Sequence, residues 1–339
     1  MTSRTRLAAS LAWRAEHMNM LRFLIRRILT GILVLWLVAT GTFFLFFTAI
    51  PVQSVARNLA GRAASPAVLQ ETIRYYGLND PILVQYWHFL DKLLHGNLGV
   101  SFYSQENVTT IIHQDLPPTI SVVIGGVLLW LIVGLAVGIL SATRARSFFD
   151  RIATVGVLAG VSAPTFVVGE LLIIFVFVQL QDHGISFITT GYNPITAGFV
   201  PWLGCMILPW ITLAIVQAAV YTRLSRGSLL DTLGEDFIRT ARSKGLTERR
   251  VLFRHAVRSA MTPVVSQLGI DVGGLLGGVI VVEQVFGLHG LGFQVVSAIS
   301  QGDQPTVIGF VIIASVFVVV ANIVVDMSYA LLDPRVRIS

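Results

Sequence analysis

Residues 28–50 read ILTGILVLWLVATGTFFLFFTAI, a predominantly apolar run that contains no charged residue. As a helix rising 1.5 Å per residue, this run is long enough to cross a hydrocarbon core of about 30 Å. It is too long for the apolar part of a cleaved signal peptide, and no convincing cleavage site of small residues follows it. We therefore expect residues 28–50 to form a membrane anchor that is retained, preceded by a tail at residues 1–27.

The composition of the whole chain agrees with a membrane protein. Of its 339 residues, 54% are hydrophobic and only 12% are charged, whereas soluble domains carry about 25% charged residues. Spans are helical because the backbone must satisfy its own polar groups in lipid. The sequence therefore predicts an all-α integral membrane protein with about six transmembrane helices. Apolar windows fall near 28–50, 119–142, 152–180, 202–221, 263–283 and 306–331.

Prolines and the single cysteine mark special positions within these windows. Pro164 and Pro209 are expected to kink their helices or to mark re-entrant ends. Cys205 is the only cysteine, so neither an internal disulfide nor a cysteine-based metal cluster can form. We expect Cys205 to be a small packing residue.

The basic residues predict the orientation. All but four of the 24 Lys and Arg residues lie in 1–27, 143–151, 223–259 and the last five residues; the four are Arg57, Arg62, Arg74 and Lys92. Because positive residues are retained in cytoplasmic segments, this pattern places both termini in the cytoplasm. The net charge of +6 is thus explained by topology and does not indicate nucleic acid binding.

Two segments stand apart from the spans. Residues 51–117 are predicted to be extracytoplasmic, with a surface helix around Ile82–Leu94 where apolar residues recur at helical spacing. Residues 118–339 form the predicted transmembrane core, including a cytoplasmic loop at 223–261. Within that loop EDFIRTARSK, at 235–244, predicts a short helix that starts with acidic residues, as the helix dipole favours. Gly234, Gly245 and Pro263 are expected to divide the loop, with Gly245 as the helix stop.

The loop has two interpretations on its own residues. It is either an ordinary positively charged inside loop, or a short amphipathic helix that inserts as a rigid knob into a groove of another protein. The order of residues favours the second interpretation. DFIRTARSKGL (236–246) followed by RRVLFRHAVRSAMTPVV (249–265) resembles the coupling-loop signature of ABC importer permeases. More narrowly, it resembles the B-type permease of dipeptide, oligopeptide and nickel importers.

The resemblance extends over residues 20–339. It includes YGLNDPILVQYW (76–87), HGNLG (95–99), FGLHGLG (286–292) and YALLDPRVR (329–337). The general importer pattern begins Glu-Ala-Ala, whereas this chain has Arg239, Thr240 and Ala241 before Gly245, and Pro263 lies further from the glycine; both departures are typical of the peptide subfamily. His289 stands where many relatives have proline.

The resemblance implies a helix parallel to the membrane that docks in a cleft of an ATP-hydrolysing subunit. The contact residues carried over are Arg239, Thr240, Ala241, Arg242, Ser243, Lys244, Gly245 and Leu246. The outer motif carried over is Phe286, Gly287, Gly290, Leu291 and Gly292. The implied function is ATP-driven import of oligopeptides or dipeptides by alternating access in a bacterial or archaeal cell membrane, with nickel or another small solute as the alternative cargo.

The implied partners are a second homologous permease, two ATP-binding domains and an extracytoplasmic substrate-binding protein. ATP and Mg²⁺ would bind to the ATPase subunits. The residues agree on this point, since the chain contains no G-x-x-x-x-G-K-[ST] phosphate loop. We expect a transport subunit that is not an enzyme and binds no cofactor of its own. A secondary transporter driven by an ion gradient would favour two similar halves, and no repeat is evident; motifs of intramembrane enzymes are also lacking.

Four acidic residues fall within predicted spans, where charge is costly. Glu283 and Asp326 lie near span ends and are expected to reach water. Glu170, six residues after Pro164, is expected to satisfy groups freed by the kink. Asp271 shares a predicted helix face with Gln267, and it either lines the translocation path or makes a structural bond between helices. His88 and His95 lack the ligand spacing of a metal site, and we predict none.

Overall fold

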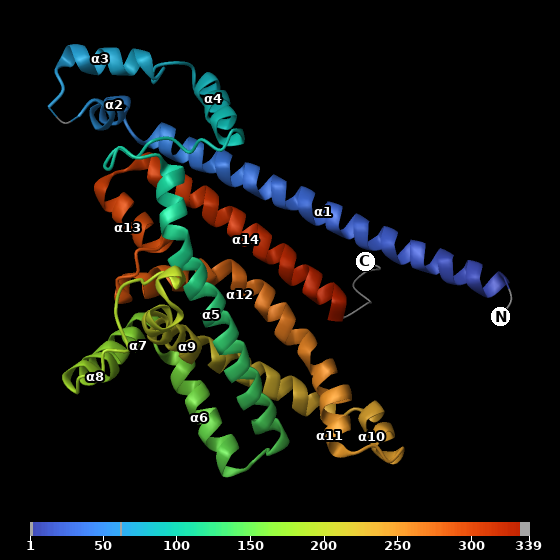
Figure 1. The fold of residues 1–339 in the computed structure, drawn as a ribbon. Helices are drawn as coiled ribbons and strands as arrows, with labels where there is room; N and C mark the ends of the chain where they lie inside the picture. Colours follow the sequence, from blue (N-terminus) through green and yellow to red (C-terminus); the bar gives the residue numbers. More distant parts are fainter. Residues whose placement is uncertain (1–2, 62, 333–339) are drawn as a thin grey trace. The chain divides into compact units, whose positions relative to one another are not determined.

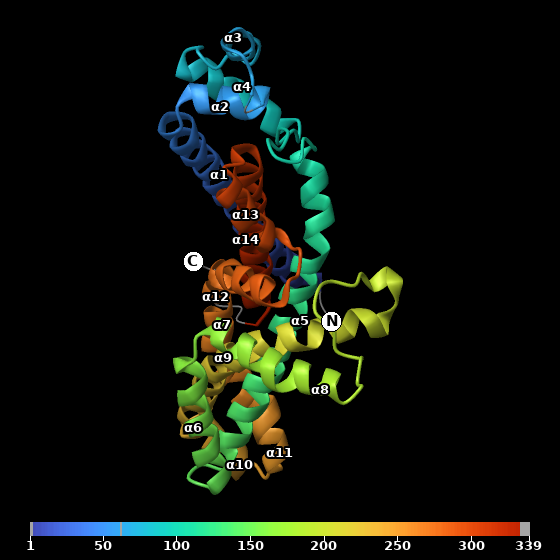
Figure 2. The same cartoon turned by 90° about the vertical axis from the view of Figure 1, so that its left-hand side faces the viewer.

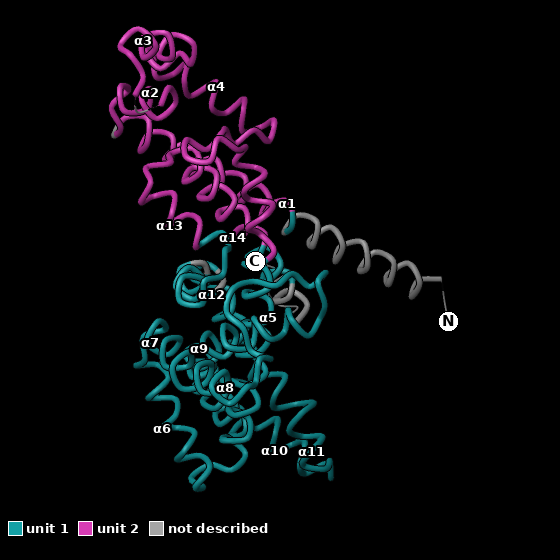
Figure 3. The backbone as a smooth tube through the Cα atoms, turned by 60° about the vertical axis from the view of Figure 1, so that its left-hand side comes forward, with its two compact units in different colours: residues 1–24, 118–292, 321–339 teal, residues 25–117, 293–320 magenta. Residues whose placement is uncertain are grey.

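The computed structural model describes the backbone of residues 3–61 and 63–332, and side chains are described from residue 24 to 327 except at 49, 62, 272 and 276. Arg62 and the predicted cytoplasmic Arg335 and Arg337 lie outside the described residues. The chain divides into two compact units, shown in Figure 3. Unit 1 comprises residues 1–24, 118–292 and 321–339, and unit 2 comprises residues 25–117 and 293–320.

The described residues are helical almost throughout, which confirms the predicted fold class (Figure 1). Five helical stretches are long and apolar enough to cross a membrane, and a sixth is bent by 44°. These stretches are Leu24–Thr48, Val108–Thr143, Thr165–Asp182, Phe199–Leu233, the bent pair Glu248–Asp271 and Gly273–Phe286, and Gln304–Met327. Each overlaps one predicted window.

Unit 2 contains the predicted extracytoplasmic helices. Helix α1 (Ser3–Ala49), which enters this unit at residue 25, is followed by α2 (Val52–Ala60), α3 (Pro66–Tyr75) and α4 (Ile82–Leu94). The bounds of α4 are those predicted from helical spacing. Thr40 of α1 and Tyr86 of α4 share a hydrogen bond of 2.7 Å, and the buried Phe43 ring lies beside Tyr86. These contacts hold α4 against α1, so the segment after the first span is folded.

A buried carboxylate organises another part of unit 2. Asp303 lies between α13 (Leu291–Gln301) and α14 (Gln304–Leu332) and is 3% exposed. Its carboxylate accepts hydrogen bonds from the Ser101 hydroxyl at 2.5 Å, the Phe102 amide at 2.8 Å and the Thr306 hydroxyl at 2.6 Å. One side chain therefore fastens the loop before α5 to the start of α14.

Unit 1 is built around α9 (Phe199–Leu233). Helices α5 (Val108–Thr143), α6 (Phe148–Ser162), α7 (Thr165–Leu172) and α12 (Val257–Phe286) surround it. The π-helical turn η1 (Ile173–Val178) and the short α8 (Gln179–Asp182) continue α7, and η2 (Ile195–Ala197) precedes α9. Figures 1 and 2 show that the turn between α5 and α6 lies at the same end of unit 1 as α10 (Asp236–Ser243) and α11 (Glu248–Arg250).

Three prolines have different effects on these helices. Pro164 separates α6 from α7, as predicted for the third window. Pro209 lies inside α9. The expectation that Pro263 divides the loop is wrong, because α12 continues through it. Neighbouring helices supply donors for carbonyls near such a proline, and here the Ser228 hydroxyl donates to the Ala260 carbonyl at 3.0 Å.

Helix therefore covers much of the predicted loop at 223–261. Helix α9 extends to Leu233, and helix resumes at Glu248 through α11 and the π-helical turn η3 (Val251–Ala256) into α12. Only residues 234–247, which include α10, lie between the two long helices. The N-terminal tail predicted at 1–27 is likewise largely part of α1.

Glycines of α5 and α6 allow close packing against α9. A Cβ atom at Gly134 would lie 3.1 Å from the Ala218 carbonyl oxygen, and one at Gly138 would lie 2.8 Å from the Thr222 carbonyl oxygen. A Cβ at Gly160 of α6 would lie 2.8 Å from the Ile215 carbonyl oxygen. Small residues thus let these backbones approach closely, as in other membrane helices.

Two glycine pairs of α12, Gly273 with Gly277 and Gly274 with Gly278, have the spacing at which membrane helices pack closely, but they behave differently. A Cβ at Gly273, Gly274 or Gly277 of α12 would meet no atom within 4 Å, and these residues are exposed. Gly278 has only an ordinary contact with Leu213. The expected close packing at these four glycines is therefore not made within the described part of the chain.

Gly138→Ala should destabilise the protein, because the added methyl group would overlap the Ser225 hydroxyl and approach the Thr222 carbonyl. Overpacking of this kind costs about 1–3 kcal/mol. Gly156→Ala in α6 is the matched control, since its Cβ would meet nothing within 4 Å. The measurement is the thermal unfolding midpoint of the detergent-solubilised protein; equal midpoints for the two variants would refute the packing at α5 and α9.

Candidate coupling site and translocation path

Helix α10 is short and firmly seated on the rest of unit 1. It begins after Glu235 and buries Ile238, which is 0% exposed, and Ala241, which is 7% exposed. These two side chains join an apolar cluster with Ala142 of α5 and Leu229 of α9. Since residues three apart share one helix face, the remaining faces of α10 are directed away from this cluster.

The end of α10 is fixed by hydrogen bonds around Gly245. The Gly245 amide donates to the Arg242 carbonyl at 2.9 Å, and the Leu246 amide donates to the Ala241 carbonyl at 3.4 Å. This pair of bonds is the Schellman motif, which requires a left-handed residue, and Gly245 has φ of +77°. The prediction that Gly245 stops the helix is confirmed.

The predicted contact residues lie mostly on the exposed side of α10. Arg239, Thr240, Arg242, Ser243, Lys244 and Gly245 are exposed, whereas Ala241 is buried and Leu246 is half-buried. The Arg242 guanidinium makes two bonds to Glu248 of α11, at 2.8 and 3.3 Å. This ion pair braces the turn after α10 while leaving most of the α10 surface open.

The sequence analysis missed one exposed aromatic residue of α10. Phe237 is 46% exposed and lies next to the buried Ile238. An aromatic side chain held open on a rigid helix is a typical anchor for a partner protein. The sequence could have indicated that Phe237 is exposed. Ile238 and Ala241 are three residues apart and define the buried face of the helix, and Phe237 lies outside this face.

Asp271 makes bonds both within its helix and to a neighbouring one. The Gln267 amide donates to one carboxylate oxygen at 2.9 Å, which confirms that these two residues share a face of α12. The Tyr221 hydroxyl of α9 donates to the other oxygen at 2.8 Å. The structural bond between helices, one of the two sequence-based alternatives, is thus present.

Asp271 also lines a cavity, and the other alternative, that it lines the translocation path, stays a prediction. A cavity of about 280 Å³ is bounded by Asp271, Trp130 and Gln217 together with apolar side chains. A second cavity of about 420 Å³ lies along the same two helices and is lined by Arg223 and Asp231 of α9 and by Gln267 of α12. Gln267 thus lines one cavity and its hydrogen-bond partner Asp271 lines the other, so a polar solute would find hydrogen-bonding groups in both.

The outer motif surrounds Glu283, and the expectation that Glu283 reaches water is wrong. This residue is 0% exposed, and its carboxylate accepts a hydrogen bond from the Thr119 hydroxyl at 2.6 Å. Gly290 and Gly292 approach so closely that a Cβ at either position would collide with the carboxylate. Because Glu283 lies near a helix end, its side chain was expected to reach water, but the chain after α12 folds back over this end.

The remaining outer residues complete that turn. Phe286 is buried at the end of α12, and Gly287 has φ of +63°. The Leu291 amide donates to the Thr119 hydroxyl oxygen at 2.8 Å. The five predicted motif residues thus form one folded turn, with the exposed His289 in it.

Glu170 does not have the structural role that was expected of it beside Pro164. It lies on α7 with an exposed side chain, and within the described residues that side chain makes no hydrogen bond or ion pair that would relieve a kink at Pro164. Asp326 is half-buried on α14. Among the described residues, no three His, Cys, Asp or Glu side chains are grouped closely enough to hold a metal ion.

Comparison with known proteins identifies the family. Residues 134–338 match the model of the binding-protein-dependent transport system inner membrane component, and residues 20–123 match the N-terminal model of the same kind of membrane component. The chain belongs to this family of transport permeases. It is therefore a multi-pass inner-membrane transport subunit and not itself an ATPase, and family membership implies ATPase and binding-protein partners.

Individual relatives of this permease cover nearly its whole length. It is 34% identical over 315 residues to a probable peptide ABC transporter permease of Sinorhizobium fredii, covering 93% of this chain and 99% of the relative. It is 38% and 36% identical over 318 residues to glutathione transport system permeases of Pectobacterium atrosepticum and Escherichia coli K12, covering 94% of this chain and 99% of each relative.

The two roles of Asp271 can be separated by substitution. Asp271→Asn removes the charge but keeps groups that can bond Tyr221 and Gln267, so we expect normal assembly and a roughly tenfold loss of substrate uptake, equivalent to about 1.4 kcal/mol. Tyr221→Phe removes the bond between helices and keeps the charge. We expect it to lower the unfolding midpoint with little loss of uptake. Equal loss of assembly and uptake in Asp271→Asn would instead assign Asp271 to packing.

Proposed function

We propose that the chain is one permease subunit of an ATP-driven importer, which moves peptides across the membrane by alternating access. The observation that carries this proposal is helix α10, which is seated by Ile238 and Ala241 and exposes Phe237, Arg239 and Thr240. A rigid helix with one buried face transmits a push from a partner to the elements on which it is packed. The peptide cargo is inferred from the relatives, whose names specify a peptide in one case and glutathione in two.

A second homologous permease is the proposed partner within the membrane. The exposed Glu170 lies in the span Thr165–Asp182, of which little is buried within the chain. Charged side chains in spans nearly always face protein or a water-filled cavity. The open glycines Gly273, Gly274 and Gly277 of α12 also leave room for close helix packing. A second subunit would cover these faces and enclose the two cavities lined by α9 and α12.

Two ATP-binding domains, one for each permease subunit, are the proposed source of energy, with ATP and Mg²⁺ bound to them. The exposed residues between Arg239 and Leu246 would form this chain's contact with one of them. An extracytoplasmic binding protein would deliver the peptide. Docking on α10 is supported by its exposed cationic and aromatic side chains, since aromatic residues and arginine are enriched at protein interfaces.

Both termini are proposed to be cytoplasmic. The turn between α5 and α6 carries Arg144 and Arg146, and it lies at the same end of unit 1 as α10 and α11 (Figures 1 and 2). Basic residues therefore collect at one end of the unit, which agrees with the positive-inside tendency.

Uptake into proteoliposomes tests the proposal. The chain is reconstituted with its partner permease, ATPases and binding protein, and radiolabelled glutathione, dialanine and pentaalanine are supplied outside. We expect uptake of at least one peptide to require ATP on the ATPase side and to persist when ionophores collapse ion gradients. Uptake that ionophores abolish and that needs no ATP would establish a secondary transporter, and uptake of labelled nickel but of no peptide would overturn the proposed cargo.

A further inference from the structure

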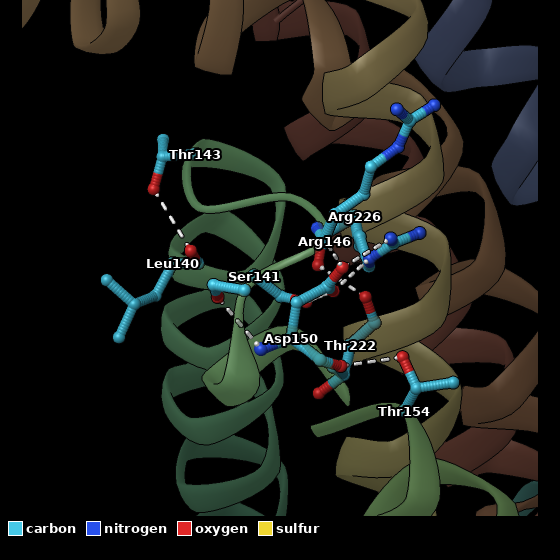
Figure 4. Close-up of polar contacts among 10 residues, drawn as sticks. Leu140, Ser141, Thr143, Arg146, Asp150, Thr154, Thr222 and Arg226 are labelled. Atoms are coloured by element: carbon cyan, nitrogen blue, oxygen red, sulfur yellow. Dashed lines mark hydrogen bonds and ion pairs between the residues drawn. The ribbon is translucent and has the colours of Figure 1, made fainter. Parts of the chain in front are cut away.

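An ion pair between the buried Asp150 and the half-buried Arg226 connects three helices of unit 1 at the end where α10 lies (Figure 4). The Arg226 guanidinium of α9 donates two hydrogen bonds to the Asp150 carboxylate of α6, at 2.7 and 2.9 Å. The same carboxylate accepts from the Ser141 hydroxyl of α5 and from the Arg146 backbone amide at 2.8 Å. One carboxylate therefore receives four hydrogen bonds from two helices and the turn that joins α5 to α6.

The geometry of this cluster resists rearrangement. Asp150 is 5% exposed, and a planar guanidinium that bonds a carboxylate twice fixes both distance and orientation. The bonds from Arg226, with those from Ser141 and Arg146, hold the pKa of Asp150 well below its usual range. Removing Arg226 would leave the buried Asp150 carboxylate without its counter-charge, which is unfavourable.

The polar cluster around Asp150 lies next to the apolar cluster on which α10 packs. Ser141 is adjacent to Ala142 on α5, and Arg226 lies one helical turn before Leu229 on α9. Ala142 and Leu229 are both members of the apolar cluster that holds Ile238 of α10. The residues that bond Asp150 are therefore carried by the same two helix ends that support α10.

Helix α6 contributes no apolar residue to the cluster that holds α10. Its residues, all of which are described, contribute none of the buried or half-buried members of the cluster around Ile238. Its attachments to α9 include the close approach of Gly160 to Ile215 and Ala219, more than two turns along the helix, and the Asp150–Arg226 pair. The ion pair thus joins the end of α9 that supports α10 to the near end of α6.

We infer that Asp150 is a positioning residue for transport: through Arg226 and Ser141 it makes α6 move as one body with α9 and α10 when the ATPase displaces α10. The inference rests on the proposed coupling role of α10. Helix α6 leads directly to Pro164 and α7, whose exposed face carries Glu170. Motion passed to α6 would reach the surface proposed to face the second permease.

A distance measurement tests this inference without needing the cargo. Spin labels are placed at Arg151→Cys on α6 and Thr247→Cys beyond α10, both exposed positions, with the buried Cys205 replaced by alanine. The distance between the two labels is measured by pulsed electron paramagnetic resonance on the full complex, without nucleotide and with ATP and vanadate. In the otherwise native chain we expect one distance that is the same in both states, and in Asp150→Asn a second population that appears with nucleotide.

Ser147→Ala is the matched control. It removes the cap that accepts the Asp150 amide at 3.2 Å but leaves every bond of the carboxylate, so it should keep the single distance. If Asp150→Asn fails to assemble, Ser141→Ala, which removes one bond and leaves the ion pair, should give a smaller second population. A single, unchanged distance in Asp150→Asn and Ser141→Ala, or a native distance that changes with nucleotide, would overturn the inference.

Transport supplies the second readout. For a labelled peptide that the native complex imports, Asp150→Asn should lower peptide imported per ATP hydrolysed by roughly tenfold, within the usual range of coupling between sites. Arg226→Gln should have the same effect, and the double variant should be no worse than either single one. Parallel losses of uptake and hydrolysis, leaving the ratio unchanged, would show a purely structural role. If no peptide is imported, the proposed function fails while the distance measurement still decides the inference.

Discussion

Close packing along α9 is the interaction on which the rest of unit 1 depends. Gly134 and Gly138 of α5 and Gly160 of α6 leave so little space that methyl groups would collide with α9 or its side chains. Tyr221 bonds Asp271 of α12, and Arg226 bonds Asp150 of α6. Since lipid gives no hydrophobic drive for helices to associate, contact geometry and polar bonds must supply the stability. Only two residues separate the end of α9 from α10, so the close packing and the proposed coupling site share one element.

The sequence predicted those features that depend on local pattern. Apolar windows located the spans, helical spacing gave α4 its bounds at Ile82 and Leu94, and the order of residues placed a helix before Gly245. These properties are set by residues near one another in the chain. The Gln267–Asp271 contact belongs to the same class, because four-residue spacing on a helix fixes it.

Features that depend on distant partners could not be predicted in this way. Glu283 is buried because Thr119, 164 residues away, donates to it and because the turn with Gly290 and Gly292 folds over it. Pro263 was expected to divide the cytoplasmic loop, but α12 continues through it, and the Ser228 hydroxyl donates to the Ala260 carbonyl nearby. Nothing local distinguishes Gly138, which packs closely, from Gly274, which faces open space.

The central claim is that α10 is the surface on which an ATPase acts. A photo-crosslinking amino acid at the exposed Thr240, in the complete transporter, tests it most directly, with the exposed Tyr75 of α3 as the control position. We expect a crosslink to an ATPase subunit from Thr240 and none from Tyr75. The proposed role of α10 would be contradicted if no position from Arg239 to Leu246 captured an ATPase while Gly245→Pro left ATP-driven uptake intact.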